Sequence, residues 1–121
     1  MKKREIKIFV DFDGTITLQD IGEAIFNKFG DAQRVDKIIT NLLEDRISSK
    51  QCWDELCDCA GAVNPDELVD FVNTMEIDQS FIAFTEFCSE NNLEMIVLSD
   101  GFDFYIDKMF EKYRLEGLKY Y

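Results

Sequence analysis

The sequence predicts an α/β fold: part of a doubly wound (Rossmann-like) parallel sheet with a small helical cap inserted after the first strand. Three observations predict it. The apolar runs Ile6–Val10 and Leu93–Leu98 are short and nearly unbroken, as in strands that a parallel sheet buries on both faces. Both runs end in polar residues, where open α/β sheets bind ligands. The roughly sixty residues between them show helical periodicity. We therefore expect an incomplete core domain at 1–17 and 78–121, and a helical cap at 18–77.

Length and charge limit the classes of function. The chain has 121 residues, 46% of them hydrophobic, which suits one domain or part of one. Its 25 acidic and 13 basic residues give a formal charge of −12, which argues against nucleic acid and anionic membranes as partners. The sequence shows neither an apolar run long enough to span a membrane nor a secretory signal pattern, so we expect a cytoplasmic protein.

The cysteines predict no metal chemistry. They are Cys52, Cys57, Cys59 and Cys88, and the chain has no histidine. Because no Cys-x-x-Cys pair occurs, a zinc site is not expected. We expect buried thiols of a reducing compartment, and Cys57-x-Cys59 as a redox pair is the alternative.

The first predicted strand ends in Asp11-Phe12-Asp13-Gly14-Thr15. Residues two apart on a strand point to opposite faces, so Asp11 and Asp13 converge only if the chain turns after Phe12. Gly14 permits that turn because it tolerates positive φ. Two converging carboxylates attract a hard cation, and Mg²⁺ is the usual one beside a phosphate. One carboxylate then stays ionised as a nucleophile, while its neighbour serves as general acid and base.

Two other interpretations of this segment remain open. Asp13-Gly14 between apolar runs is also a β-hairpin signal. Asp11-x-Asp13-Gly14 also resembles the first half of a calcium loop, which requires Glu at its twelfth position, where this chain has Gly22.

Apolar periodicity and capping signals then predict four helices between the first strand and about residue 77. The first starts after Asp20 and ends at Gly30; the second covers about 32–45; the third follows the capping box Ser48-x-x-Gln51 and ends at Gly61; the fourth opens at Asn64-Pro65. Asp20 and Glu23 have a structural interpretation, as N-cap and capping-box acid of the first helix. Their functional interpretation is contact with the substrate.

The second half continues the alternation. A fifth helix at about 79–91 precedes the strand Leu93–Leu98, a sixth helix covers about 102–113, and 118–121 could begin a third strand. Lys108 and Lys112 are predicted to lie on the solvated face of the sixth helix.

Ser99-Asp100-Gly101 joins the second strand to the sixth helix. A hydroxyl and unpaired backbone N–H groups at a helix start favour an anion, and Gly101 permits close approach of the backbone. The segment therefore predicts a phosphate site. The alternative is that it only caps the helix.

Together these segments resemble two signatures of the haloacid dehalogenase superfamily. Asp11-Phe12-Asp13-Gly14-Thr15 is similar to its Asp-x-Asp-x-Thr motif, and Ser99 is similar to the Ser or Thr that ends its next strand. The run Leu98–Ile106 resembles the phosphoserine-phosphatase-like branch. Within it the pattern looks closest to phosphatases of methionine salvage and of phosphocholine and phosphoethanolamine. The helical insert resembles the family's small cap.

The resemblance implies roles for the first motif. Asp11 would attack the phosphorus and form an aspartyl-phosphate. Asp13 would protonate the leaving alcohol and later take a proton from water. Mg²⁺ would be held by the Asp11 carboxylate and the Asp13 carbonyl. Thr15 would brace the loop.

The resemblance also implies a phosphoryl site. Ser99 and the N–H groups of Asp100 and Phe12 would hold the oxygens, and the cap would close over them. The family's later Lys and acidic pair have no match before Tyr121. We expect the N-terminal half of a larger protein; a short chain completed by a C-terminal half or a second copy, and a degenerate relative, are the alternatives.

The expected function is that of a phosphoric monoester hydrolase, acting with Mg²⁺ on a small phosphorylated metabolite, as a property of the complete protein. Two alternatives remain open: a phosphotransferase or mutase of the same superfamily, and a non-catalytic phosphate-binding or interaction module.

Overall fold

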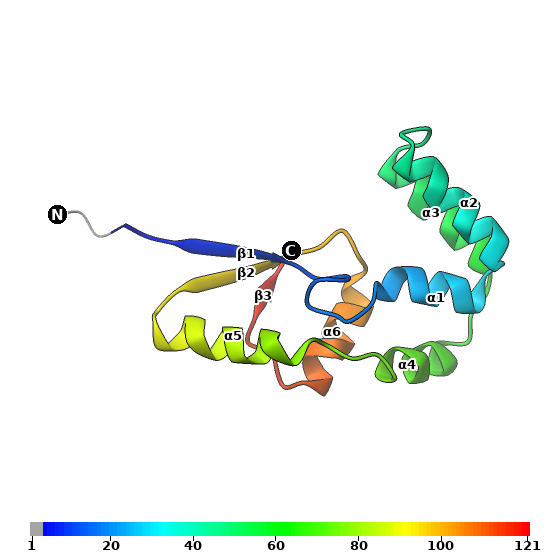
Figure 1. Cartoon of the computed structure of the whole chain (residues 1–121). Helices are drawn as coiled ribbons and strands as arrows, with labels where there is room; N and C mark the ends of the chain where they lie inside the picture. Colours follow the sequence, from blue (N-terminus) through cyan, green and yellow to red (C-terminus); the bar gives the residue numbers. More distant parts are fainter. Residues whose placement is uncertain (1–3) are drawn as a thin grey trace. The chain divides into compact units, whose positions relative to one another are not determined.

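The computed structural model describes residues 4–121 as two compact units (Figure 1). One unit holds the chain up to Ile21 together with Val72–Tyr121, and the other is Gly22–Phe71. The predicted domain limits, 1–17 with 78–121 and 18–77, stay a prediction. The elements in chain order are β1 (Lys7–Asp11), α1 (Ile21–Phe29), α2 (Ala32–Leu43), α3 (Ser49–Ala60), α4 (Pro65–Asn73), α5 (Gln79–Glu90), β2 (Glu94–Leu98), α6 (Asp103–Lys112) and β3 (Lys119–Tyr120).

The first unit contains a parallel sheet of strand order β1-β2-β3, so the predicted α/β class is confirmed. In its register Lys7 pairs with Glu94 and Asp11 with Leu98. Because the two strands are parallel and end together, the segments that follow Asp11 and Leu98 leave the sheet side by side at its carboxyl edge. Among the described residues the segment after Gly14 forms no ladder with β1, and its Thr17 pairs with Ile77 instead, so the β-hairpin interpretation of Asp13-Gly14 is wrong.

The prediction that both strands are buried on both faces is wrong. Met95 and Val97 of β2 are buried, whereas Phe9 is 58% and Leu98 44% exposed. Figure 1 shows the reason: α5 and α6 both lie below the sheet. Side chains alternate between the two faces of a strand, so only every second residue meets these helices. Among the residues that the structure describes, the face with Phe9 and Leu98 stays accessible.

The core of this unit lies between the sheet and α5 and α6. Its centre is aromatic: the Phe12 ring stacks on Tyr105 at 6.1 Å and meets Phe110 edge-on at 5.7 Å. On the α6 side of this core, Ile106, Met109 and Phe110 are at most 2% exposed. The segments around Thr17 and Ile77, both in this unit, pair through one antiparallel bridge.

Lys112 is exposed, as predicted for the solvated face of α6, but its ammonium group also makes hydrogen bonds that the sequence did not predict. Its Nζ donates to the carbonyls of Asn73 and Met75, each at 2.7 Å. Asn73 ends α4 and Met75 lies just beyond it, and a helix leaves its last carbonyls without partners inside the helix. A cation there satisfies them and suits the negative end of the helix dipole. Lys108 is 39% exposed at its side chain and pairs with Glu111 at 3.7 Å, as a solvated-face residue does.

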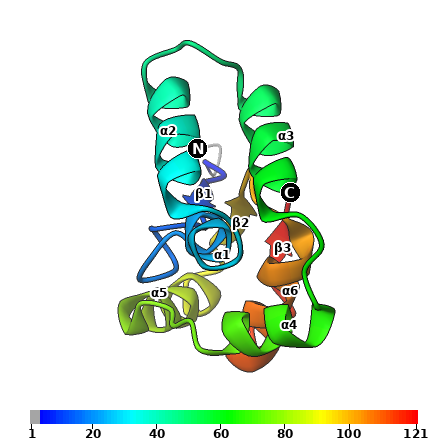
Figure 2. The ribbon, with the colours of Figure 1, turned by 90° about the vertical axis from the view of Figure 1, so that its right-hand side faces the viewer.

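The second unit is helical. Figure 2 shows α2 and α3 side by side, and their facing residues form a core. The predicted capping box of α3 is confirmed: the Ser48 hydroxyl accepts from Gln51 N–H, and the Gln51 amide accepts from Ser48 N–H. Asn64 caps α4 as expected. The core residues of this unit are Phe26, Val35, Ile38, Cys52 and Leu56.

The cysteines divide into two groups. Cys52 and Cys88 are buried, as expected, but Cys57 is exposed, which the sequence did not predict. Burial of part of its surface and the charges of Asp54 and Asp58 raise the pKa of the Cys57 thiol, so it is a weaker nucleophile than an ordinary thiol at neutral pH. No described helix is both long and apolar enough to cross a bilayer. The cytoplasmic location stays a prediction.

Candidate active site

The chain turns back directly after β1. The Phe12 carbonyl accepts N–H bonds from Thr15, Ile16 and Thr17 at 3.2, 2.9 and 3.2 Å, so one oxygen anchors the whole turn. Gly14 sits in this turn with φ 72°. The turn predicted to follow Phe12 is therefore present, and the glycine occupies the position that needs left-handed backbone. The buried Phe12 ring fixes the turn to the core of the unit.

Asp11 stands exposed at the end of β1. Its Oδ1 accepts the Phe12 N–H at 2.9 Å, and its Oδ2 accepts the Thr15 hydroxyl at 3.5 Å. Thr15 thus contacts the carboxylate that the sequence assigns to the nucleophile, as expected of a residue that braces the loop. The Phe12 N–H, which was expected to bind the phosphoryl group, here binds Asp11.

Asp13 is partly buried, and both oxygens of its carboxylate accept hydrogen bonds from the protein. Its Oδ2 accepts the Tyr105 hydroxyl at 2.6 Å, and its Oδ1 accepts the N–H of Ile21, the first residue of α1, at 2.9 Å. The sequence reasoning missed both partners. Tyr105 lies one helical turn beyond Gly101, so its spacing on α6 was the signal that could have placed it at the strand ends.

The loop after β2 is also ordered by its own side chain. The Ser99 hydroxyl accepts the Gly101 N–H at 3.0 Å, and the Ser99 N–H donates to the Tyr121 carbonyl at 2.9 Å. The helix that follows starts at Asp103, and its N-cap residue, Phe102, makes no side-chain capping bond. Capping of α6 by the Ser99–Gly101 segment, the alternative to a phosphate site, is therefore not what this segment does.

Gly101 links the two loops. A Cβ built on it would lie 1.8 Å from Tyr105 Oη and 2.8 Å from Asp13 Oδ2. The loop of the second predicted motif therefore packs directly against the acid of the first. Residue 101 has to be glycine for that reason, rather than for an unusual backbone angle.

The two predicted substrate-contacting acids differ in position. Asp20 lies close enough to Tyr105 that its charge contributes to raising the Tyr105 pKa. Glu23 is exposed in the first turn of α1 and belongs to the other unit. Contact of either residue with a substrate stays a prediction.

The residues present fit Mg²⁺ in their chemistry. Asp11 offers exposed carboxylate oxygens beside the main chain of the turn, and Mg²⁺ in proteins is usually bound by one or two carboxylates, with water and phosphate completing its shell. Within residues 4–121 no group of three or more His, Cys, Asp or Glu side chains gathers as a metal site.

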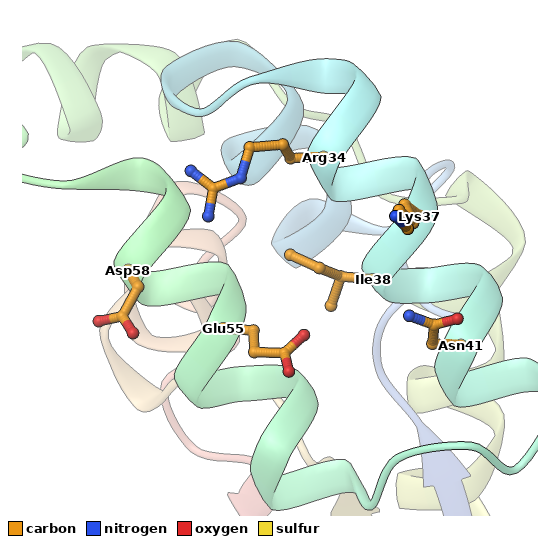
Figure 3. A pocket seen from close by; sticks show the side chains of 6 residues that line it. All are labelled: Arg34, Lys37, Ile38, Asn41, Glu55 and Asp58. Carbon is orange, nitrogen blue, oxygen red and sulfur yellow. The ribbon is translucent and has the colours of Figure 1, made fainter.

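A second cavity, of about 300 Å³, lies in the helical unit between α2 and α3 (Figure 3). The Arg34 guanidinium and the Glu55 carboxylate point into the space between the two helices. Two cations on one helix face two carboxylates on the other, so the charges balance and the cavity does not select an anion. Its lining residues are Arg34, Lys37, Ile38, Asn41, Glu55 and Asp58.

Comparison of sequences finds relatives that are named phosphatases. No protein-family model matches the chain. It is 32% identical over 114 residues to Pdp3-interacting factor 1 of Schizosaccharomyces pombe, covering 93% of this chain and 49% of that protein. It is 32% identical over 102 residues to 2-hydroxy-3-keto-5-methylthiopentenyl-1-phosphate phosphatase of Bacillus thuringiensis, covering 84% and 46%. The chain thus spans about half the length of the curated relatives it matches.

Comparison of structures finds the same fold. A phospho-aspartyl intermediate analogue of phosphoserine phosphatase superposes with a TM-score of 0.80 at 20% identity, over 98% of this chain and 55% of the other. A HAD family hydrolase from Salmonella enterica serovar Typhi superposes with a TM-score of 0.79 at 15% identity, over 96% and 38%. At these identities the likeness concerns the fold.

Proposed function

We propose that this chain, which resembles phosphatases of the haloacid dehalogenase superfamily in sequence and in fold, carries the nucleophile and phosphate loops of a Mg²⁺-dependent phosphoric monoester hydrolase. One observation supports the proposal most. The parallel register pairs Asp11 with Leu98, so the turn with Asp11 and Asp13 and the loop with Ser99 emerge at one edge. The contact of Gly101 with the Tyr105–Asp13 pair joins them.

In this proposal Asp11 is the nucleophile. Its carboxylate attacks the phosphorus of a small phosphomonoester, the P–O bond to the alcohol breaks, and an aspartyl-phosphate forms. Asp13 gives a proton to the departing alkoxide, then takes one from the water that cleaves the aspartyl-phosphate. Bound Mg²⁺ supplies neutralisation of the phosphoryl charge.

The phosphoryl oxygens would be held by the Ser99 hydroxyl and by backbone N–H groups at Phe12, Asp100 and Gly101. The Phe12 and Gly101 N–H groups now donate to Asp11 and Ser99, so binding exchanges these internal bonds for bonds to the ligand. A phosphate ligand at this edge also lies near the start of α6, whose dipole favours an anion.

The partner proposed for this unit is a polypeptide that completes the sheet, either a C-terminal half or a second copy. The exposed face of the sheet supports this proposal. Parallel sheets are ordinarily covered on both faces, whereas Phe9 and Leu98 on this face are 58% and 44% exposed. β1 is also an edge strand, with a free row of backbone groups that can pair with a further strand.

The test measures Mg²⁺-dependent release of phosphate from a panel of small phosphomonoesters. Asp11→Asn should abolish release, and Asp36→Asn, which changes an exposed aspartate on α2, should not. A second measurement does not need turnover: in the presence of Mg²⁺, beryllofluoride should give a bound ¹⁹F signal that Asp11→Asn removes. A bound signal that persists in Asp11→Asn contradicts the assignment of the nucleophile.

A further inference from the structure

Tyr105 is a buried polar residue that the proposed chemistry does not use. It is fully buried on α6, and its ring packs on Phe12 at 6.1 Å, Phe102 at 6.4 Å and Phe104 at 6.3 Å. Three neighbouring aromatic rings leave the buried Tyr105 ring little freedom to turn. Its hydroxyl is thereby fixed at one place, beside the turn that follows β1.

At that place the hydroxyl has an anionic acceptor. It donates to Asp13 Oδ2 at 2.6 Å, a distance typical of a hydrogen bond to a charged carboxylate. Burial, followed by the bond to Asp13, raises the pKa of Tyr105 far above its usual range. The hydroxyl therefore keeps its proton at any physiological pH and acts as a permanent donor.

The opposite oxygen of Asp13 is held as well. The Ile21 N–H donates to Oδ1 at 2.9 Å, so the two oxygens of the carboxylate are held from two different elements, α6 and the start of α1. A carboxylate held at both oxygens keeps one orientation. Beside Gly101 there is no room even for a methyl group, because a Cβ built there would lie 1.8 Å from the Tyr105 hydroxyl and 2.8 Å from Asp13 Oδ2.

We propose that Tyr105 is the positioning residue for Asp13: its hydroxyl sets the orientation of the acid–base carboxylate relative to the loop that carries Ser99 and Gly101. The geometric part of this inference stands on the structure alone. Its catalytic consequence rests on the proposed function, in which Asp13 exchanges a proton with the leaving alcohol and with water.

The catalytic consequence depends on the leaving group. Tyr105→Phe keeps the ring and removes the donor, so Asp13 loses one of its two anchors. An alkyl phosphate needs its alkoxide protonated as it leaves, whereas p-nitrophenyl phosphate releases a stable phenolate without that help. We expect kcat/KM, which reports the step that forms the aspartyl-phosphate, to fall about ten- to a hundredfold for an alkyl phosphate, the range of one charge-assisted hydrogen bond, and less than about threefold for the aryl ester.

The geometric part is tested by NMR on the chain itself, with ¹³C-labelled aspartate and tyrosine. The Asp13 Cγ resonance is assigned by its loss in Asp13→Asn. It should shift in Tyr105→Phe and stay in place in Tyr121→Phe, a matched change at a side chain that is 75% exposed. The Tyr105 Cζ resonance should shift in Asp13→Asn, which gives a second reading if Tyr105→Phe does not fold.

The outcomes separate the two proposals. If neither resonance moves, Tyr105 does not hold Asp13, and the inference is wrong whether or not the chain is a phosphatase. If the resonances move but kcat/KM falls equally for the alkyl and aryl esters, Tyr105 supports the fold and not the protonation of the leaving group, which overturns the catalytic part. If the resonances move and no phosphomonoester is hydrolysed, the positioning contact holds and the proposed function fails.

Discussion

Gly101→Ala tests the contact between the two loops most directly. The structure leaves no space for a methyl group at this position, because its carbon would lie 1.8 Å from Tyr105 Oη, 2.7 Å from Tyr105 Cζ and 2.8 Å from Asp13 Oδ2. The backbone at residue 101 is not in the left-handed region, so alanine meets no backbone strain there. The effect of the substitution is therefore the displacement of Tyr105, and with it of the Asp13 carboxylate.

Two losses set its magnitude. Moving the hydroxyl breaks a hydrogen bond to a carboxylate, which costs about 1.5–3 kcal/mol. Forcing the ring out of a packed aromatic cluster adds about 1–3 kcal/mol of overpacking. Together we expect Gly101→Ala to lower the free energy of unfolding by about 3–5 kcal/mol, a large share of the roughly 5–15 kcal/mol typical of a domain.

The assay is urea unfolding followed by far-UV circular dichroism. Gly117→Ala is the matched control, since a Cβ there meets no atom within 4 Å and the backbone is likewise not left-handed; it should change stability by less than about 1 kcal/mol. The double variant Gly101→Ala/Tyr105→Phe should be less destabilised than the sum of the two single variants, because the closest clash is gone. Equal midpoints for Gly101→Ala and Gly117→Ala would refute the close packing of the loops.

Three further predictions concern contacts outside the site. Lys112→Met removes the ammonium group that donates to the carbonyls of Asn73 and Met75, and it should lower the free energy of unfolding by about 1–3 kcal/mol. Lys108→Met removes only an exposed ion pair, and in the same urea titration it should cost less than about 1 kcal/mol. Ser48→Ala removes half of the α3 capping box and should cost about 1 kcal/mol, read from the thermal midpoint. The hydrogen bond to Asp107 raises the Tyr120 pKa to about 12, so the stabilisation by this bond is complete below pH 10 and is lost as the pH rises through 12. Tyr120→Phe should flatten this part of the plot of the free energy of unfolding against pH, and an unchanged plot would contradict the prediction.

Periodicity predicted the fold well because it depends on which residues are apolar, and that is visible in the sequence. The two strands, the six helices and the parallel pairing follow from it. The burial of the strand residues could not be predicted from periodicity. An unbroken apolar run such as that of β1 indicates a strand made to be covered on both faces, but coverage depends on other segments, and Phe9 is exposed because α5 and α6 occupy one side only.

The candidate site was predicted in its residues more than in its contacts. The turn at Gly14 and the proximity of the Asp11 and Ser99 segments follow from local spacing and from strand polarity. The partners of Asp13 do not, because Tyr105 is 92 residues away and meets it only through the packing of α6 on the sheet. In the sequence, Tyr105 is one more apolar residue of a helix stripe. Only the folded structure shows that its hydroxyl donates a hydrogen bond to Asp13.

These contacts bear on how an acidic chain could hold a phosphate. With a formal charge of −12 and carboxylates at residues 11, 13, 20 and 100, the sheet edge would repel an anion. The lysines of α6 do not offset this, since Lys112 is committed to the carbonyls after α4 and Lys108 to Glu111. Tyr105 removes part of the repulsion by holding Asp13 toward the protein interior, where both its oxygens accept protein donors. Asp11 then remains as the accessible carboxylate of the turn, so a cation bound there would neutralise the charge that stands closest to an incoming phosphate. In the proposed function the two aspartates of one short motif would thus have separate tasks, Asp11 toward ligand and metal and Asp13 in proton transfer.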